Sequence, residues 1–296
     1  SLDRRQRQMC IRDRIDRNQI REVNIGSSNS LTEIQKDVLY KLNKQLKEKD
    51  IILLHGVTSS GKTEIYIKLI EKYLKLGKQV LYLLPEISLT TQIIQKLRNH
   101  FANKISVYHS RYSLNERTEV WESIRNNKEN SQLVIGARSS VFLPFDDLGL
   151  IIVDEEHEVS YKQQEPSPRY NARDSAIYLS KIFKSKIILG SATPSIESTY
   201  NARNNKYGFV EIKERYGNIE MPFIHTIDMK AEPKHEFSSI FSKKLVDEIN
   251  KAVDKGKQVI IFRNRRGYSP QWQCCSCGHN IMLSLIHISE PTRPID

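Results

Sequence analysis

The sequence predicts an α/β fold in which helices cover both faces of a parallel sheet. From residue 51 onward, short apolar runs typical of buried strands alternate with amphipathic stretches typical of helices. The first of these strands leads into a glycine-bounded loop and then a helix, and a later strand ends in a run of acidic residues. Short buried strands separated by helices are characteristic of parallel sheets, and such sheets bind ligands at the carboxyl ends of their strands.

The predicted elements follow the apolar periodicity of the chain. Thr32 is the expected N-cap of a first helix, with Gln35 as its capping-box partner. Strands are predicted at residues 51–54, 80–84, 106–108, 133–135, 150–153 and 187–189, and helices at 90–101, 115–125 and 172–183. Further along, strands near 223–228 and at 259–262 flank a predicted helix over 242–253.

The predicted organisation is one complete lobe over residues 31–200 and the start of a second over 221–282. Residues 15–30 and 201–220 are polar and weakly patterned, which is typical of linkers. The end runs 1–14 and 283–296 resemble a translated adaptor used to prepare sequencing libraries, so we expect them not to be native.

The net charge and the apolar content of the sequence indicate which kinds of molecule the protein could bind. The net charge of +11 suits a polyanion such as nucleic acid, although lysine-rich proteins without that role share it. No apolar run approaches the roughly 20 residues of a membrane span, and no secretory signal pattern opens the chain. We therefore expect a soluble cytoplasmic protein with no membrane partner.

The loop after the first strand fits the phosphate-binding pattern G-x-x-x-x-G-K-[ST]. Its glycines allow a tight turn whose backbone N–H groups point at phosphate oxygens, and the following helix N-terminus adds its positive dipole end. Lys62 supplies a catalytic cation for the β- and γ-phosphates, and the Thr63 hydroxyl is suited to Mg²⁺. An ordinary Gly/Ser loop shares this composition, but the strand–loop–helix context favours nucleotide binding. The predicted ATP-binding residues are Gly56, Val57, Thr58, Ser59, Ser60, Gly61, Lys62 and Thr63.

The acidic run at the end of the 150–153 strand predicts the hydrolytic groups. An aspartate at such a strand end holds Mg²⁺ in phosphate-loop NTPases, so Asp154 is assigned to the metal and Glu155 to the attacking water. Glu156 and His157 are better placed to sense the γ-phosphate or neighbouring motifs. The alternative is a solvated acidic helix start, favoured by the helix dipole.

Small hydroxyl residues follow the 187–189 strand, in the run Gly190-Ser191-Ala192-Thr193-Pro194. We predict that Ser191 and Thr193 hydrogen-bond the acidic run and relay the nucleotide state to a DNA site. By itself, the run would be an ordinary Ser/Pro turn.

Together these stretches resemble superfamily 2 helicases and, more narrowly, the primosomal replication-restart DNA helicases. The resemblance covers about residues 31–282, and its most specific stretches are Tyr161-Lys162-Gln163-Gln164 and Asn264-Arg265-Arg266-Gly267-Tyr268. It implies an ATP-dependent 3′-to-5′ helicase with two RecA-like P-loop NTPase lobes. It also implies single-stranded and forked DNA, primosome proteins and single-strand-binding protein as partners. The second lobe's later motifs, including its arginine finger, lie outside this sequence, so we expect nucleotide binding to exceed hydrolysis and no unwinding.

The resemblance also implies roles for individual residues. Segment 161–173 would couple DNA contact to hydrolysis: a tyrosine would stack on a base and basic side chains would meet phosphates. These residues are Tyr161, Lys162, Arg169, Tyr170 and Arg173. Pro85, Arg138 and Ser139 suit the sugar-phosphate track at the strand ends, or equally helix caps. Gln35 stands where related helicases read adenine, with a capping-box role as the alternative.

Cys274 and Cys277 have zinc-knuckle spacing, with Cys275 and His279 nearby. Structural zinc needs four ligands, and the family resemblance places further cysteines beyond this stretch. We expect Cys274 and Cys277 to be ligands of a zinc site that is incomplete here, with free cytosolic thiols as the alternative.

Three other functions remain open on the sequence. One is a double-stranded DNA translocase or restriction-type motor without strand separation, which an assay on forked DNA distinguishes. Another is a small-molecule kinase or GTPase, whose hydrolysis would be indifferent to DNA. The third is a non-catalytic DNA-binding module, which the presence of Lys62, Asp154 and Glu155 disfavours.

Overall fold

The computed structural model describes residues 31–86, 91–110, 112–215, 223–229, 231, 241–262, 272–273 and 280–281. The chain divides into two compact units, Ser1–Met221 and Pro222–Asp296. Each unit is described by itself. In the described ranges, no helix has both the length and the apolar character needed to cross a membrane.

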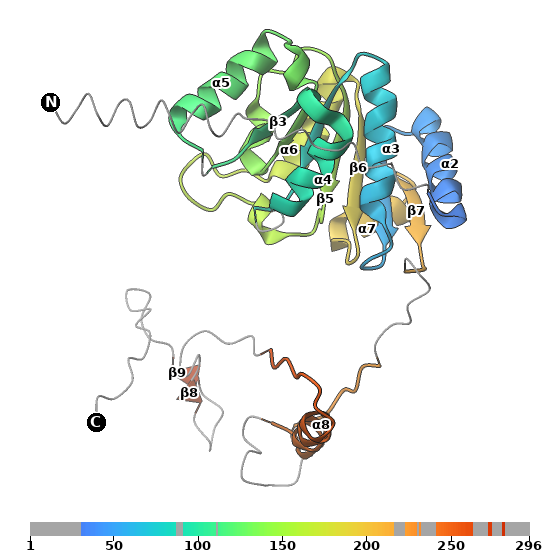
Figure 1. The fold of residues 1–296 in the computed structure, drawn as a ribbon, viewed down its shortest axis with the longest axis vertical. Coiled ribbons are helices and arrows are strands. Elements are labelled where there is room, and N and C mark those ends of the chain that lie inside the picture. Colours follow the sequence, from blue (N-terminus) through green and yellow to red (C-terminus); the bar gives the residue numbers. More distant parts are fainter. Residues whose placement is uncertain are drawn as a thin grey trace, which may run out of the picture. The chain divides into compact units, whose positions relative to one another are not determined.

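The first unit is built on a seven-stranded sheet in the order β3-β4-β2-β5-β6-β1-β7. Figure 1 labels β3, β5, β6 and β7 of this sheet and shows the helices packed around it. Every neighbouring pair is parallel. The strands are β1 Ile51–Gly56, β2 Gln79–Leu83, β3 Ile105–Tyr108, β4 Leu133–Gly136, β5 Leu148–Asp154, β6 Lys186–Ser191 and β7 Gly208–Ile212. The six strands predicted from the apolar runs are therefore confirmed, and the predicted parallel α/β architecture with them.

The helices of this unit are short and mostly amphipathic. They are α2 Glu33–Glu48, α3 Lys62–Lys75, α4 Thr91–Phe101, α5 Leu114–Arg125, α6 Ala172–Phe183 and α7 Ile196–Arg203. Single 3-10 turns lie between them at η1 Ala102–Lys104, η2 Glu129–Ser131, η3 Arg138–Phe142 and η4 Val159–Tyr161. The predicted capping box forms at α2, since Thr32 accepts from the Gln35 N–H and Gln35 accepts from the Thr32 N–H.

Two apolar cores lie on opposite faces of the sheet. Along β5, Leu150 and Ile152 belong to the core under α2, α3 and α4, whereas Ile151 and Val153 belong to the core under α5 and α6. This alternation follows from the two-residue period of a strand. Asp154 continues the first series, so its side chain points to the α3 face.

The range 201–220, predicted as a linker, contains a strand that the prediction missed. Gly208–Ile212 forms β7 and pairs in parallel with β1. Its residues alternate between buried and exposed, with Val210 and Ile212 in the core and Phe209 and Glu211 outward. An edge strand with one buried face carries half the apolar residues of a central strand, which is why its pattern is weak.

The second unit contains α8 Lys243–Asp254, which confirms the helix predicted over 242–253. Two short strands, β8 Trp272–Gln273 and β9 Asn280–Ile281, pair antiparallel. The predicted strands near 223–228 and at 259–262 are wrong, because these residues have no regular secondary structure. Their apolar side chains are exposed, Ile260 at 94%, and an apolar run becomes a strand only where a neighbouring strand accepts its backbone hydrogen bonds.

Several sequence predictions fall outside the described residues. These are the zinc-ligand pair Cys274 and Cys277, the Asn264–Tyr268 stretch, and residues 87–90 after Pro85.

Candidate active site

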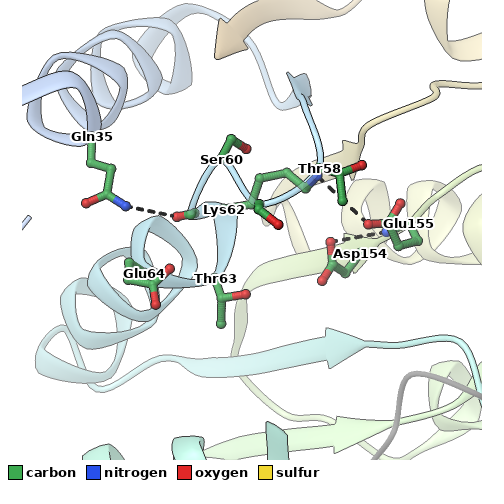
Figure 2. Close-up of a pocket in the computed structure, with 10 residues that line it drawn as sticks. Gln35, Thr58, Ser60, Lys62, Thr63, Glu64, Asp154 and Glu155 are labelled. Atoms are coloured by element: carbon green, nitrogen blue, oxygen red, sulfur yellow. Dashed lines mark hydrogen bonds and ion pairs between the residues drawn. The ribbon is translucent and has the colours of Figure 1, made fainter. Parts of the chain in front are cut away.

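A cavity of about 450 Å³ opens at the carboxyl ends of β1 and β5 (Figure 2). It brings together most of the predicted nucleotide-site residues, although they come from three separate parts of the sequence. Its lining residues are Gln35, Thr58, Ser59, Ser60, Gly61, Lys62, Thr63, Glu64, Asp154 and Glu155. Glu64 was not predicted from the sequence.

The loop between β1 and α3 has the backbone that a phosphate cradle requires. Gly61 caps α3 in the left-handed region at φ 79°, and Ser59 also has a positive φ of 62°. A side chain at Gly61 would collide with the Gln35 amide as well as strain the backbone. The buried Ser60 hydroxyl has no hydrogen-bond partner within the described part of the chain, which suits an incoming phosphate oxygen.

Lys62 lies between this loop and the acidic run. Its ammonium donates to the Gly56 carbonyl at 2.8 Å and lies 3.8 Å from the Glu155 carboxylate. Only 10% of the side chain is exposed. Figure 2 shows Lys62 and Glu155 facing each other across the cavity. This cation therefore balances carboxylates when no nucleotide is bound and is available to phosphates when one enters.

Gln35 forms the predicted capping box and also lines the cavity. Besides its capping-box bonds, its amide nitrogen donates to the Gly61 carbonyl at 3.4 Å, and its side chain lines the cavity. The residue thus ties the start of α2 to the phosphate loop. Contact with adenine remains a prediction.

Asp154 stands at the end of β5, partly buried at the floor of the cavity. Its carboxylate accepts hydrogen bonds from the Tyr66 hydroxyl at 3.2 Å and the Tyr82 hydroxyl at 3.1 Å. Burial and the neighbouring Glu155 raise the pKa of Asp154 to about 6, against the lowering effects of Lys62 and the two hydroxyls. Asp154 and the Thr63 hydroxyl offer hard oxygen donors to the same cavity, which fits Mg²⁺ shared with phosphate oxygens.

The raised pKa predicts how stability depends on pH in the nucleotide-free, Mg²⁺-free chain. The unfolded carboxyl ionises near 3.8 and the folded one at about 6, so the folded state holds the proton more tightly between these values. Ionisation of Asp154 should therefore lower the free energy of unfolding by about 3 kcal/mol as pH rises through this window. Denaturation of wild type and Asp154→Asn across this range measures the effect as a difference between the two curves. If the free energies of unfolding of wild type and Asp154→Asn changed equally with pH, the raised pKa of Asp154 would be contradicted.

Glu155 follows Asp154 with a left-handed backbone at φ 47°, which is uncommon for a residue with a side chain. This turn directs its carboxylate toward Lys62 at 3.8 Å and toward His157 Nδ1 at 3.7 Å. A third of the side chain is exposed, at 34%. The carboxylate is thus accessible to a water molecule in the cavity, as the predicted water-orienting role requires.

Glu156 has different surroundings from those of Glu155. Its side chain is fully buried and lies 3.1 Å from the Arg173 guanidinium. It also accepts from the Ser195 N–H at 2.7 Å, the Ser195 hydroxyl at 3.0 Å and the Ser198 hydroxyl at 2.9 Å. These bonds link the end of β5 to the starts of α6 and α7. Ser195 and Ser198 were not predicted from the sequence.

His157 joins the acidic run to the segment after β6. Its Nδ1 is 2.8 Å from the Ser191 hydroxyl, and its Nε2 is 3.3 Å from the Thr193 hydroxyl. The Ser191 hydroxyl also accepts from the Thr193 N–H at 2.9 Å. The structure therefore brings three of the four predicted coupling residues into contact, whereas the Glu156 side chain bonds Arg173, Ser195 and Ser198.

Segment 161–173 is attached to the acidic run at both ends. The Tyr161 hydroxyl donates to the Asp154 carbonyl at 2.7 Å, and Arg173 pairs with Glu156. Tyr161 is 1% exposed, so no ring face is free for a base. The stacking role predicted for Tyr161 disagrees with this burial. Likewise, the paired Arg173 guanidinium is 12% exposed, which disagrees with a direct phosphate contact.

The rest of that segment forms a closed, exposed loop. Lys162 and Asn171 form an antiparallel bridge, and the Gln163 N–H donates to the Tyr170 carbonyl at 2.8 Å. Lys162 and Arg169 are exposed. The Tyr170 ring is half-buried against the exposed Phe142, with ring centroids 4.8 Å apart.

The strand-end residues lie on the same carboxyl edge of the sheet. Pro85 follows β2 and is buried, whereas Arg138 and Ser139 open η3 after β4 and are half-buried. The Arg138 guanidinium donates to the Lys162 carbonyl at 3.4 Å, which places η3 beside the 162–171 loop. The burial of Pro85 disagrees with its predicted contact with the sugar-phosphate track, whereas Arg138 and Ser139 remain partly accessible beside this loop.

Comparison with known proteins places the cavity residues within a family of nucleotide-dependent enzymes. Residues 32–202 match the DEAD/DEAH box helicase family, which accounts for more than half of the chain. The chain belongs to the DEAD/DEAH box helicase family. The seven-stranded parallel sheet is accordingly the RecA-like lobe characteristic of this family.

The curated relatives are replication restart proteins. The chain is 42% identical over 232 residues to the replication restart protein PriA of Bacillus subtilis, covering 78% of this chain and 28% of the relative. It is 46% identical over 249 residues to that of Rickettsia felis, covering 84% and 37%. The chain thus spans about a third of the length of these relatives. A structure of RecG bound to a three-way DNA junction aligns with 23% identity and a TM-score of 0.45, over 64% of this chain and 24% of that one.

Proposed function

We propose that this chain is the ATP-binding lobe of a DNA helicase that restarts replication at stalled forks. The observation that carries the proposal is the cavity in which Lys62, Asp154 and Glu155 converge at the ends of β1 and β5. Resemblance to PriA proteins adds 3′-to-5′ movement on single-stranded DNA in the cytoplasm, with primosome proteins and single-strand-binding protein as partners. A second lobe, beginning near residue 221 with a zinc site at Cys274 and Cys277, would complete the motor.

In this proposal each residue has a defined task. Backbone N–H groups of residues 57–61 and the Lys62 ammonium hold the phosphates, and Thr63 and Asp154 hold Mg²⁺. When bound, Mg²⁺ neutralises charge on the phosphate oxygens. Glu155 orients the attacking water and accepts its proton. His157, Ser191 and Thr193 then relay the state of the phosphate site through their mutual hydrogen bonds.

Hydrolysis of ATP by this chain, measured across concentrations of single-stranded and duplex oligonucleotides of equal length, tests the proposal. Affinity for a labelled single strand, with and without a non-hydrolysable ATP analogue, tests the same coupling if turnover is slow. Stimulation by the single strand, or an affinity that depends on the analogue, supports a DNA motor. The proposal would be contradicted if DNA did not change the rate of ATP hydrolysis and the ATP analogue did not change the affinity for the single strand. That result would favour a small-substrate NTPase.

The exposed loop gives a more local prediction about DNA. Because Tyr161 is buried, Tyr170 is the member of the predicted pair with ring surface available to a base. Tyr170→Ala should weaken single-strand binding about tenfold, since stacking contributes roughly 1–3 kcal/mol per base. Fluorescence anisotropy of a labelled oligonucleotide measures the change. Tyr40→Ala, at an exposed tyrosine of α2, is the matched control, and equal affinities in both variants would exclude the stacking role.

A further inference from the structure

Two buried tyrosines hold the Asp154 carboxylate. The Tyr66 hydroxyl donates to Oδ1 and the Tyr82 hydroxyl donates to Oδ2, so each carboxylate oxygen has its own donor. Both rings are completely buried, and they meet edge to face with centroids 5.8 Å apart. A third donor, the Glu155 N–H, lies 3.2 Å from Oδ1. The carboxylate is therefore fixed in its plane before any metal arrives.

The fold places these two rings at the carboxylate for identifiable reasons. Tyr66 lies one helical turn after Lys62 on α3, so both side chains project from one side of that helix. Tyr82 lies on β2, whose neighbour is β5, and the two-residue period puts Tyr82 and Asp154 on the same face of the sheet. Helix α3 therefore carries both Lys62, which is predicted to contact the phosphates, and Tyr66, which contacts Asp154.

Gly190 makes room for this arrangement. It is the β6 residue that stands directly opposite Asp154 in the sheet. A Cβ atom there would overlap the Tyr66 hydroxyl and lie 3.5 Å from the Asp154 carboxylate. Gly190, which directly precedes Ser191, therefore has a steric role beside Asp154 that is separate from the hydrogen bonds of Ser191 and Thr193.

We propose that Tyr66 and Tyr82 are positioning residues of the Mg²⁺–nucleotide site, whose hydroxyls fix the Asp154 carboxylate for the metal, and that Gly190 preserves the space for the Tyr66 hydroxyl. The inference rests on the proposed role of Asp154 as the Mg²⁺ ligand. Its physical basis is general: groups that hydrogen-bond a metal-binding carboxylate set its orientation and basicity, and losing one typically costs about 10- to 100-fold in metal affinity or activity. The alternative is that both are core tyrosines whose hydroxyls merely need an acceptor.

Nucleotide binding with and without Mg²⁺ separates these two roles. Tyr66→Phe, Tyr82→Phe and the double variant keep the buried rings and remove the hydroxyls alone. Binding of a fluorescent ADP is measured in EDTA and across a Mg²⁺ titration. We expect each single variant to need about tenfold more Mg²⁺ for half-maximal tightening, and the double variant more still, while affinity in EDTA stays unchanged. Tyr73→Phe, two turns further along α3, is the matched control and should behave as wild type.

Gly190→Ala tests whether Gly190 preserves the space for the Tyr66 hydroxyl. The added methyl group should displace the Tyr66 hydroxyl and raise the Mg²⁺ requirement as Tyr66→Phe does. Because both changes act on one contact, Gly190→Ala combined with Tyr66→Phe should be less impaired than the sum of the single effects. Simple additivity would overturn the role of Gly190.

The outcomes are distinct. A raised Mg²⁺ requirement with unchanged EDTA affinity, in variants that melting curves show to be folded at the assay temperature, supports the positioning role. A wild-type Mg²⁺ requirement in the double variant overturns it, and so does an equal loss with and without Mg²⁺, which would indicate a purely structural role. If the wild-type chain itself binds ADP without any response to Mg²⁺, the proposed function fails, and the positioning role fails with it.

Discussion

Replacing Lys62 with alanine should weaken ATP binding by roughly a hundredfold or more. The ammonium is the one predicted catalytic cation in the cavity, and hydrogen bonds from a cation to phosphate contribute about 1.5–3 kcal/mol each. Losing its contacts to two phosphates removes about 3 kcal/mol, which corresponds to about two orders of magnitude in Kd. Titration of a fluorescent nucleotide, in the presence of Mg²⁺, measures the loss.

Two further measurements make this result interpretable. Lys68→Ala removes a lysine from the same helix, where the side chain pairs with Glu71 at 3.0 Å, and should leave nucleotide affinity unchanged. The melting temperature shows whether Lys62→Ala still folds, because removing the cation leaves Asp154 and Glu155 with less compensation. Tight nucleotide binding by a folded Lys62→Ala chain would exclude the role given to this lysine.

Much of the fold could be predicted because each central element has a strong local signal. The β1, β2 and β5 strands are buried on both faces and read as unbroken apolar runs, and α2 begins at a capping box that its own sequence specifies. β7 gave no such signal, because only one of its faces is buried. The apolar run at 259–262 had the signal of a strand but has no partner among the described residues.

The candidate site likewise contains residues that the local sequence predicts and others that only the tertiary structure reveals. The phosphate loop and the acidic run are contiguous in sequence, so their spacing was sufficient to predict them. The bonds from Glu156 to Ser195 and Ser198 join residues about 40 positions apart, and no local pattern specifies such pairs. Tyr161 shows the other limit, since an aromatic residue in a basic segment suggests stacking, whereas its burial depends on the tertiary packing of η4.

Replacing Glu156 with alanine should be the most damaging substitution for stability near the site. This fully buried carboxylate accepts from two serines and pairs with Arg173, whose side chain is 12% exposed. Without Glu156, the Arg173 guanidinium keeps only the exposed carboxylates of Asp174 and Glu197 as partners. Removing the buried partner of an ion pair typically costs up to about 3–5 kcal/mol. Urea denaturation followed by circular dichroism should show a loss of this size in the free energy of unfolding.

The neighbouring Glu197 provides a matched control for this prediction. It lies 4.0 Å from the same Arg173 guanidinium, but its side chain is 71% exposed, so Glu197→Ala should cost no more than about 0.5 kcal/mol. If the pair itself carries the effect, adding Arg173→Met to Glu156→Ala should cost less than the sum of the two single changes, because no buried charge then remains. Equal losses for Glu156→Ala and Glu197→Ala would mean that the buried network does not hold α6 and α7 to the acidic run. A large loss for Glu156→Ala that Arg173→Met does not relieve would instead attribute the stabilisation to the serine hydrogen bonds.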